Sequence, residues 1–158
     1  MKMTHVDERG EARMVDIGGK PVTARRAVAQ AYIHMSQDAL SAIRENSLVK
    51  GDALGAARIA GIMAAKRVDE LIPLCHSLPL SAATVDFTVE EDGVRVTASA
   101  STTAQTGVEM EALTAASIAA LTVYDMCKSI DKRISIDEIR LVQKTGGKSG
   151  DFDWDPSE

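Results

Sequence analysis

Aromatic residues are scarce in this chain: Phe, Trp and Tyr together make up 3% of its 158 residues. Proteins that bind single-stranded nucleic acid stack the bases on aromatic side chains, so the composition disfavours this class. The net charge is −5 and the isoelectric point is about 5.2, whereas binders of nucleic acid or anionic membranes need a positive surface. We therefore expect neither nucleic acid nor a membrane as a partner.

Cysteine and histidine are also few and badly spaced for disulfides or metals. Cys75 and Cys127 form no CxxC pair, which excludes a disulfide framework and a zinc ribbon and predicts two reduced thiols. The three histidines, His5, His34 and His76, match no recognised ligand spacing, so we predict no metal site.

Long apolar runs are missing as well. No run approaches the roughly 20 residues that a membrane-spanning helix needs, and residues 1–10 lack the apolar core of a signal peptide. We expect a cytoplasmic protein. The length and a hydrophobic content of 45% are those of one globular domain, with a partly mobile N-terminal arm (about 1–20) and C-terminal tail (about 150–158).

The first half of the chain has the pattern of a strand followed by two helices. Apolar residues alternate over 22–35 with the period of a strand. Ser36 is suited to cap a helix over 37–47, and Asp52 to cap one that reaches about Val68. Prolines bound the segment 73–79, which predicts a rigid loop.

The second half predicts a hairpin, a long helix and a last strand. Alternating residues flank Asp92-Gly93, a typical hairpin turn. A helix follows over about 108–130 and a strand over 133–144, and no regular element is predicted after Gly150. The resulting order, strand, helical pair, two strands, helix and strand, predicts an α+β ferredoxin-like fold, an antiparallel sheet with helices packed on one face.

The long helix carries charges among apolar residues that cover nearly all its directions, which predicts that it is buried. Asp125 and Lys128 are three apart, so they form either an ordinary surface pair or, in a partly dry site, a pair suited to proton transfer. Glu111 lies 14 residues before Asp125, about 21 Å along a helix. One reacting atom cannot touch both, so the ligand is long or two subunits complete each site.

Two loops offer further candidates. His76 lies beside Cys75 on the rigid loop, where an imidazole can act as acid, base or phosphate contact, or be purely structural. The segment 144–150 fails as a P-loop because Val142 stands where glycine is required. Its glycines, Lys144 and Lys148 can still surround a phosphate, unless it is only a solvated loop.

Several lysines and arginines stand at the ends of predicted elements of this acidic chain. Taken singly they are surface charges, but together they favour a local anion site. This set comprises Arg25, Lys50, Arg58, Lys66 and Arg67.

Long blocks of the chain together resemble one family. They include Thr4-His5, Met14-Val15-Asp16, Lys50-Gly51-Asp52, residues 57–62, 64–67, 71–76, 106–113, Tyr124-Asp125-Met126-Cys127-Lys128 and 146–151. In this order they resemble the MoaC family, the cyclic pyranopterin monophosphate synthases of molybdenum cofactor biosynthesis.

The resemblance implies a lyase that works by general acid/base catalysis. Such an enzyme converts (8S)-3',8-cyclo-7,8-dihydroguanosine 5'-triphosphate to cyclic pyranopterin monophosphate and releases pyrophosphate. The family likeness also implies a homohexamer, a trimer of dimers with sites between subunits, and no tightly bound cofactor. Whether Mg²⁺ accompanies the substrate triphosphate stays open.

The same resemblance assigns roles to individual residues. The implied catalytic residues are Asp125, Lys128 and Lys50, with Lys128 exchanging protons while Asp125 tunes it. The implied substrate-binding residues are Arg25, Leu74, Cys75, His76, Glu109, Met110, Glu111 and Lys144.

Two positions depart from the family pattern. Gln105 stands where many relatives carry Lys, which weakens one expected phosphate contact, and Ser77 replaces Pro, which loosens the loop. A non-catalytic nucleotide-binding regulatory module of the same fold is the alternative function, since a fold alone fixes no activity.

Overall fold

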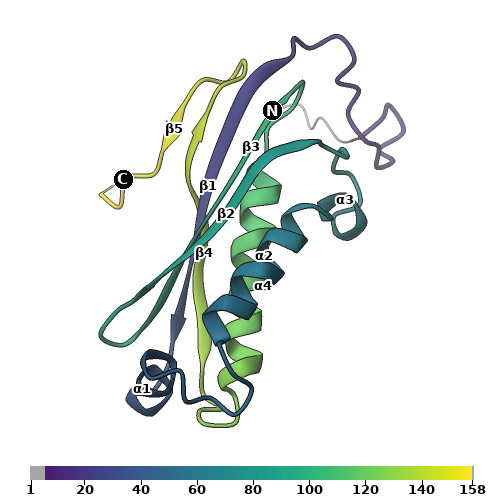
Figure 1. The fold of residues 1–158 in the computed structure, drawn as a ribbon. Helices are drawn as coiled ribbons and strands as arrows, with labels where there is room; N and C mark the ends of the chain where they lie inside the picture. Colours follow the sequence, from purple (N-terminus) through teal and green to yellow (C-terminus); the bar gives the residue numbers. More distant parts are fainter. Residues whose placement is uncertain (1–5, 158) are drawn as a thin grey trace.

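The computed structural model describes residues 6–157, so Thr4, His5 and the rest of the first five residues lie outside the description. The predicted order of elements is confirmed, with two short additions (Figure 1). The elements are β1 (Thr23–His34), α1 (Gln37–Arg44), α2 (Ala53–Ala65), α3 (Val68–Leu71), β2 (Leu80–Val89), β3 (Gly93–Ala104), α4 (Glu109–Cys127), β4 (Ser135–Thr145) and β5 (Phe152–Asp153).

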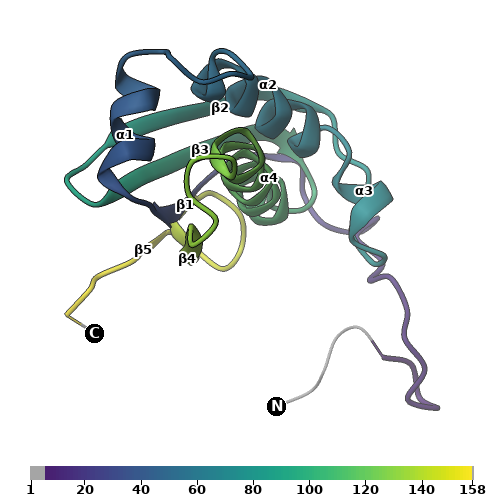
Figure 2. The ribbon, with the colours of Figure 1, turned by 90° about the horizontal axis from the view of Figure 1, so that it is seen from below.

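The strands form one antiparallel sheet in the order β2-β3-β1-β4-β5. The first and third strands of the chain, β1 and β3, lie at its centre, as a ferredoxin-like connection requires. Helices α2 and α4 lie side by side on one face of this sheet (Figure 2). The predicted α+β class, with helices packed on one face of an antiparallel sheet, is confirmed.

Small side chains bring these layers close together. The face of β1 toward the helices consists of Ala27, Ala29, Ala31 and Ile33, all of them buried in the core. Between α2 and α4, a Cβ on Gly61 would lie 2.8 Å from the carbonyl oxygen of Ala115. Any side chain at Gly61 would push the two helices apart, which explains the Ala- and Gly-rich sequence of α2.

The predicted helix starts are confirmed. The Ser36 hydroxyl accepts from the amide of Ala39 at 3.4 Å, and the Asp52 carboxylate accepts from the amide of Gly55 at 2.9 Å. Each cap satisfies an amide that lacks a partner within its helix. The segment 73–79 contains no helix or strand, as its prolines predict.

Helix α4 differs from its prediction in that it is not buried all round. The sheet covers one side and α2 another, and the remaining side is open: Leu121 is 54% exposed. Its apolar sequence therefore includes residues that this chain alone leaves uncovered. The helix also ends at Cys127 rather than near Ile130.

The C-terminal segment contains structure that periodicity did not predict. Phe152 and Asp153 pair with β4, and the Arg140 guanidinium stacks on the Trp154 ring at 4.2 Å. A two-residue strand is too short to produce an alternating pattern. Across residues 6–157, each helix is too short or too polar to cross a membrane.

Candidate active site

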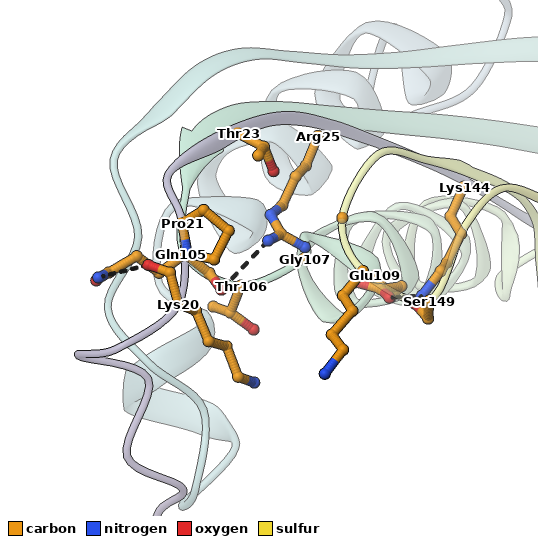
Figure 3. A pocket seen from close by; sticks show the side chains of 12 residues that line it. Lys20, Pro21, Thr23, Arg25, Gln105, Thr106, Gly107, Glu109, Lys144 and Ser149 are labelled. Atoms are coloured by element: carbon orange, nitrogen blue, oxygen red, sulfur yellow. Dashed lines mark hydrogen bonds and ion pairs between the residues drawn. The ribbon is translucent and has the colours of Figure 1, made fainter.

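A cavity of about 830 Å³ opens where α4 begins (Figure 3). The start of β1, the loop from β3 to α4 and the loop after β4 form its walls. Its lining residues are Lys20, Pro21, Thr23, Arg25, Gln105, Thr106, Gly107, Glu109, Lys144, Gly147, Lys148 and Ser149. Four cations thus face one carboxylate, that of Glu109, which makes the cavity attractive to an anion.

Arg25 is held by backbone carbonyls from the end of β3 and the loop that follows it. Its Nε donates to the carbonyl of Ala104 at 3.0 Å and its Nη2 to the carbonyl of Gln105 at 3.3 Å. Gly147, with φ +86°, passes so close to the guanidinium that a Cβ there would collide with it. The glycine of the loop after β4 therefore lets this loop close over Arg25.

Lys144 and Glu109 form an ion pair on the cavity wall. The Lys144 ammonium donates to the Glu109 carboxylate at 2.8 Å and to the Ser149 hydroxyl at 3.0 Å. Burial is the largest single influence on Glu109 and opposes its ionisation, but the hydrogen bond from Lys144, a backbone hydrogen bond and the charges of Lys144 and Arg25 together outweigh it, so the pKa of Glu109 is lowered. Glu109 is therefore ionised at neutral pH and neutralises one of the four cations.

A second cavity of about 320 Å³ adjoins the first. It shares Lys20, Thr106, Gly107 and Glu109 with the larger cavity. Its other lining residues are Val15, Ile17, Leu74, Cys75, His76, Leu78, Met110 and Glu111. The rigid loop and the first turn of α4 thus present one continuous surface to a ligand that extends from the cation-lined cavity.

Burial controls the acid groups of this second cavity. Desolvation raises the pKa of Glu111, and the charges of Glu109 and Asp69 add to the effect. Desolvation likewise raises the pKa of the Cys75 thiol, assisted by the Glu111 charge. The His76 Nε2 lies 2.7 Å from the carbonyl of Val15, so this histidine joins the loop to the N-terminal arm.

Three charged side chains meet at the opposite end of α4. Asp125 lies 2.6 Å from the Lys128 ammonium and 2.7 Å from that of Lys50. Lys50, from the loop between α1 and α2, also donates to the backbone carbonyl of Asp125 at 2.9 Å. The three side chains, hereafter the Asp125 triad, are 45–54% exposed, so the pair is not dry in the single chain.

The ion pairs shift the pKa values of Asp125 and Lys128 in opposite directions. Hydrogen bonds from Lys128, and then Lys50, lower the pKa of Asp125 to about 2. The hydrogen bond to Asp125 raises the pKa of Lys128. In one chain surrounded by water, Lys128 is therefore a stable cation, and a base only after its surroundings change.

The structure thus divides the predicted site residues into two groups. Eight gather around the two cavities: Arg25, Leu74, Cys75, His76, Glu109, Met110, Glu111 and Lys144. The other three form the Asp125 triad, about 21 Å away along α4. Among residues 6–157, no three His, Cys, Asp or Glu side chains are arranged to hold a metal ion.

A family model describes most of the chain: the MoaC family model matches residues 14–147. The chain belongs to the MoaC family. Similar proteins named "Cyclic pyranopterin monophosphate synthase" come from Novosphingobium aromaticivorans (59% identity over 148 residues), Corynebacterium glutamicum (58% over 151) and Peptoclostridium acidaminophilum (50% over 153). The alignments cover 94–97% of this chain and 94–98% of the relatives.

The MoaC match contains every predicted site residue, from Arg25 to Lys144. Some cavity residues were not among those predictions. Lys20 is one of them, although a lysine between Gly19 and Pro21 has the sequence context of a loop that holds an anion. Gln105 and Ser77, the two residues expected to depart from the family pattern, both form hydrogen bonds. The Gln105 amide donates to carbonyls of the N-terminal arm, and the Ser77 hydroxyl donates to the Asp69 carboxylate.

Proposed function

We propose that this MoaC-family protein is a cyclic pyranopterin monophosphate synthase that acts in molybdenum cofactor biosynthesis. Its substrate would be the cyclised dihydroguanosine triphosphate, and its products cyclic pyranopterin monophosphate and pyrophosphate. The observation that carries the proposal is the family match, together with relatives of that name over nearly the full length. The cation-lined cavity beside the His76 loop suits a triphosphate attached to a fused ring system.

The phosphate chemistry fits the larger cavity. A sugar hydroxyl would attack the α-phosphorus to form the cyclic monophosphate, and the bond to the pyrophosphate oxygen would break. Such phosphorus–oxygen lyase chemistry needs cations on the triphosphate, because negative charge builds up on the leaving group. Arg25, Lys144 and the further lysines of this cavity would supply that charge, and the leaving pyrophosphate would take the proton of the hydroxyl.

The ring chemistry needs proton transfer, which we assign to the Asp125 triad. Lys128 would exchange protons while Asp125 sets its pKa and Lys50 shares the carboxylate. Burial of the triad against a substrate and a second subunit would oppose the charged ammonium and lower the pKa of Lys128 toward neutrality. This change of surroundings is what the isolated chain lacks.

The proposed assembly follows from the distance along α4. A site that uses both the cavities and the Asp125 triad has to combine the two ends of α4 from different subunits. The apolar side chains of Ile59, Met63 and Leu121, each about half exposed on α2 and α4, are suited to packing against another copy. We therefore propose the homohexamer, a trimer of dimers with sites between subunits.

The proposal includes no resident cofactor. A Mg²⁺ ion, where one is used, would arrive on the substrate triphosphate, and assays in EDTA against added Mg²⁺ decide this point. The free cysteines Cys75 and Cys127 support a reducing compartment, the cytoplasm.

The deciding experiment incubates the purified protein with the cyclised dihydroguanosine triphosphate. Pyrophosphate release is followed continuously, and the pterin product is identified by its mass. Equal amounts of pyrophosphate and cyclic monophosphate would establish the synthase. Binding of the triphosphate without either product would overturn it in favour of a regulatory nucleotide-binding module.

A further inference from the structure

Gln105 connects three segments that meet at the larger cavity. It lies in the loop between β3 and α4, and its side chain points to the N-terminal arm (Figure 3). The Nε2 amide donates to the carbonyl oxygens of Gly18 and Lys20, each at 3.0 Å. A primary amide has two N–H bonds, so these two carbonyls use both.

The carbonyls belong to a tight turn that presents Lys20. The amide of Lys20 donates back to the carbonyl of Ile17 at 2.9 Å, and the amide of Gly18 donates to the Asp16 carboxylate at 2.8 Å. The turn is thus ordered internally, and the Gln105 amide attaches it to the core. Lys20 lines both cavities, at the point where they adjoin.

The backbone of Gln105 acts on a second cation. Its carbonyl oxygen accepts from the Arg25 guanidinium at 3.3 Å, so one residue contacts both Arg25 and the turn of Lys20. Lys144 is already paired with Glu109. Lys20, Arg25 and Lys148 therefore carry the net positive charge that the cavity offers to an anion, and the position of Lys20 decides about a third of it.

We infer that Gln105 is a positioning residue, whose amide holds the 18–20 turn so that the Lys20 ammonium stays at the junction of the two cavities. The ligand class is a polyphosphate. Its identity as the substrate triphosphate rests on the proposed function. Without the amide, the turn would swing away from the β3–α4 loop, and Lys20 would contact the anion for only part of the time.

The test compares Gln105→Met, which keeps the length but has no donor, with Gln105→Lys, whose ammonium restores donors to the same carbonyls. Hydrogen–deuterium exchange of a peptide over residues 14–20 reports the turn directly. Inorganic tripolyphosphate, titrated by calorimetry, reports the anion site. Gln105→Met should speed exchange, weaken tripolyphosphate binding about fivefold and raise KM with little change in kcat, whereas Gln105→Lys stays within about twofold of the wild type.

A double variant separates positioning from an independent contact. Because Gln105 acts through Lys20, adding Gln105→Met to Lys20→Met should weaken tripolyphosphate binding no further than Lys20→Met alone. Additive losses, or unchanged exchange in Gln105→Met, would overturn the inference. Neither readout needs the reaction, so wild-type protein that releases no pyrophosphate would contradict the proposed synthase while leaving this role of Gln105 intact.

Discussion

The charged side chains at the two ends of helix α4 differ in their surroundings. At its first turn, Glu109 and Glu111 lie against cavities, and burial strongly influences both carboxyl groups. At its last turn, the Asp125 triad stands about half exposed, and ion pairing dominates. One end has a space for a ligand and an acid with a raised pKa, and the other has a strong ion pair in contact with water.

This difference indicates what each end lacks. The cavity end holds cations for phosphate, but its histidine already contacts the carbonyl of Val15. The triad end has a lysine and an aspartate for proton transfer, but the ion pair between them keeps both in their charged forms. Each end supplies what the other lacks, which favours a site that joins two subunits.

The largest effect should come from Asp125→Asn. The amide keeps the shape of the side chain but removes the charge that holds Lys50 and Lys128, so turnover should fall about 10²- to 10⁴-fold. The rate of pyrophosphate release measures it. Asp86→Asn is the matched control, because Asp86 also pairs with a cation, the Arg58 guanidinium at 3.8 Å, but lines neither cavity.

Assembly and ligand binding have to survive for this result to mean catalysis. Light scattering and tripolyphosphate titration of Asp125→Asn should match the wild type. Unchanged turnover would make the triad a structural ion pair and remove it from the mechanism.

Mixing two inactive variants tests whether the ends meet between subunits. Asp125→Asn damages one end and His76→Ala the other, so co-expressed chains with different tags form mixed oligomers. If each site uses one end from each of two chains, random pairing leaves about a quarter of the sites intact, with a corresponding share of wild-type activity. Mixed oligomers that are no more active than their parents would show that both ends serve a site within one chain.

Lys144→Met should have a smaller effect, confined to the cavity end. Loss of the ammonium removes the proposed contact to the substrate phosphates and takes away the ion-pair partner of Glu109. KM should rise about 10- to 100-fold, the range for hydrogen bonds to charged groups, and kcat should change less. Steady-state kinetics separate the two. A fall in kcat at constant KM would place Lys144 in the chemical step instead of in binding.

The sequence predicted the fold well because its signals are local. The alternation in β1, the caps Ser36 and Asp52, and the Asp92-Gly93 turn each act within a few residues, and all are confirmed. The pairing of Phe152 with Lys144 is not local in this sense, since two residues carry no period. The exposed side of α4 was missed because periodicity shows which residues are apolar but not what covers them.

The site was predicted less completely than the fold. Residue types and family likeness indicated Lys144 and Glu109, but only the structure pairs them. The roles of Lys20 and Gln105 become visible only through a contact between residues 85 positions apart in the chain. No local sequence pattern predicts such a contact. The clustering of cavity residues from four segments is likewise a property of the sheet topology.

The smallest predicted effect is a pair of changes in Tm at the cavity end, which should have opposite signs. Burial raises the pKa of Glu111 above its ordinary 4.5, so its charge destabilises the folded state once the pH exceeds that value, and Glu111→Gln should raise Tm there. The pKa of Glu109 is lowered, so its charge stabilises the fold above pH 4.5, a contribution that is lost as the pH falls. Glu109→Gln should therefore lower Tm at neutral pH.

Each shift in Tm should be no more than a few degrees at pH 7 for a chain of this length. The Glu111 shift should shrink as the pH falls through the raised pKa of Glu111 and be gone below 4.5. The Glu109 shift should begin to shrink only below 4.5, because the lowered pKa keeps the folded-state carboxylate ionised there. Thermal unfolding of both variants at pH 7 and pH 4 measures the contrast. Shifts of the same sign at pH 7 would contradict this assignment. They would mean that burial does not control Glu111, or that ion pairing does not control Glu109.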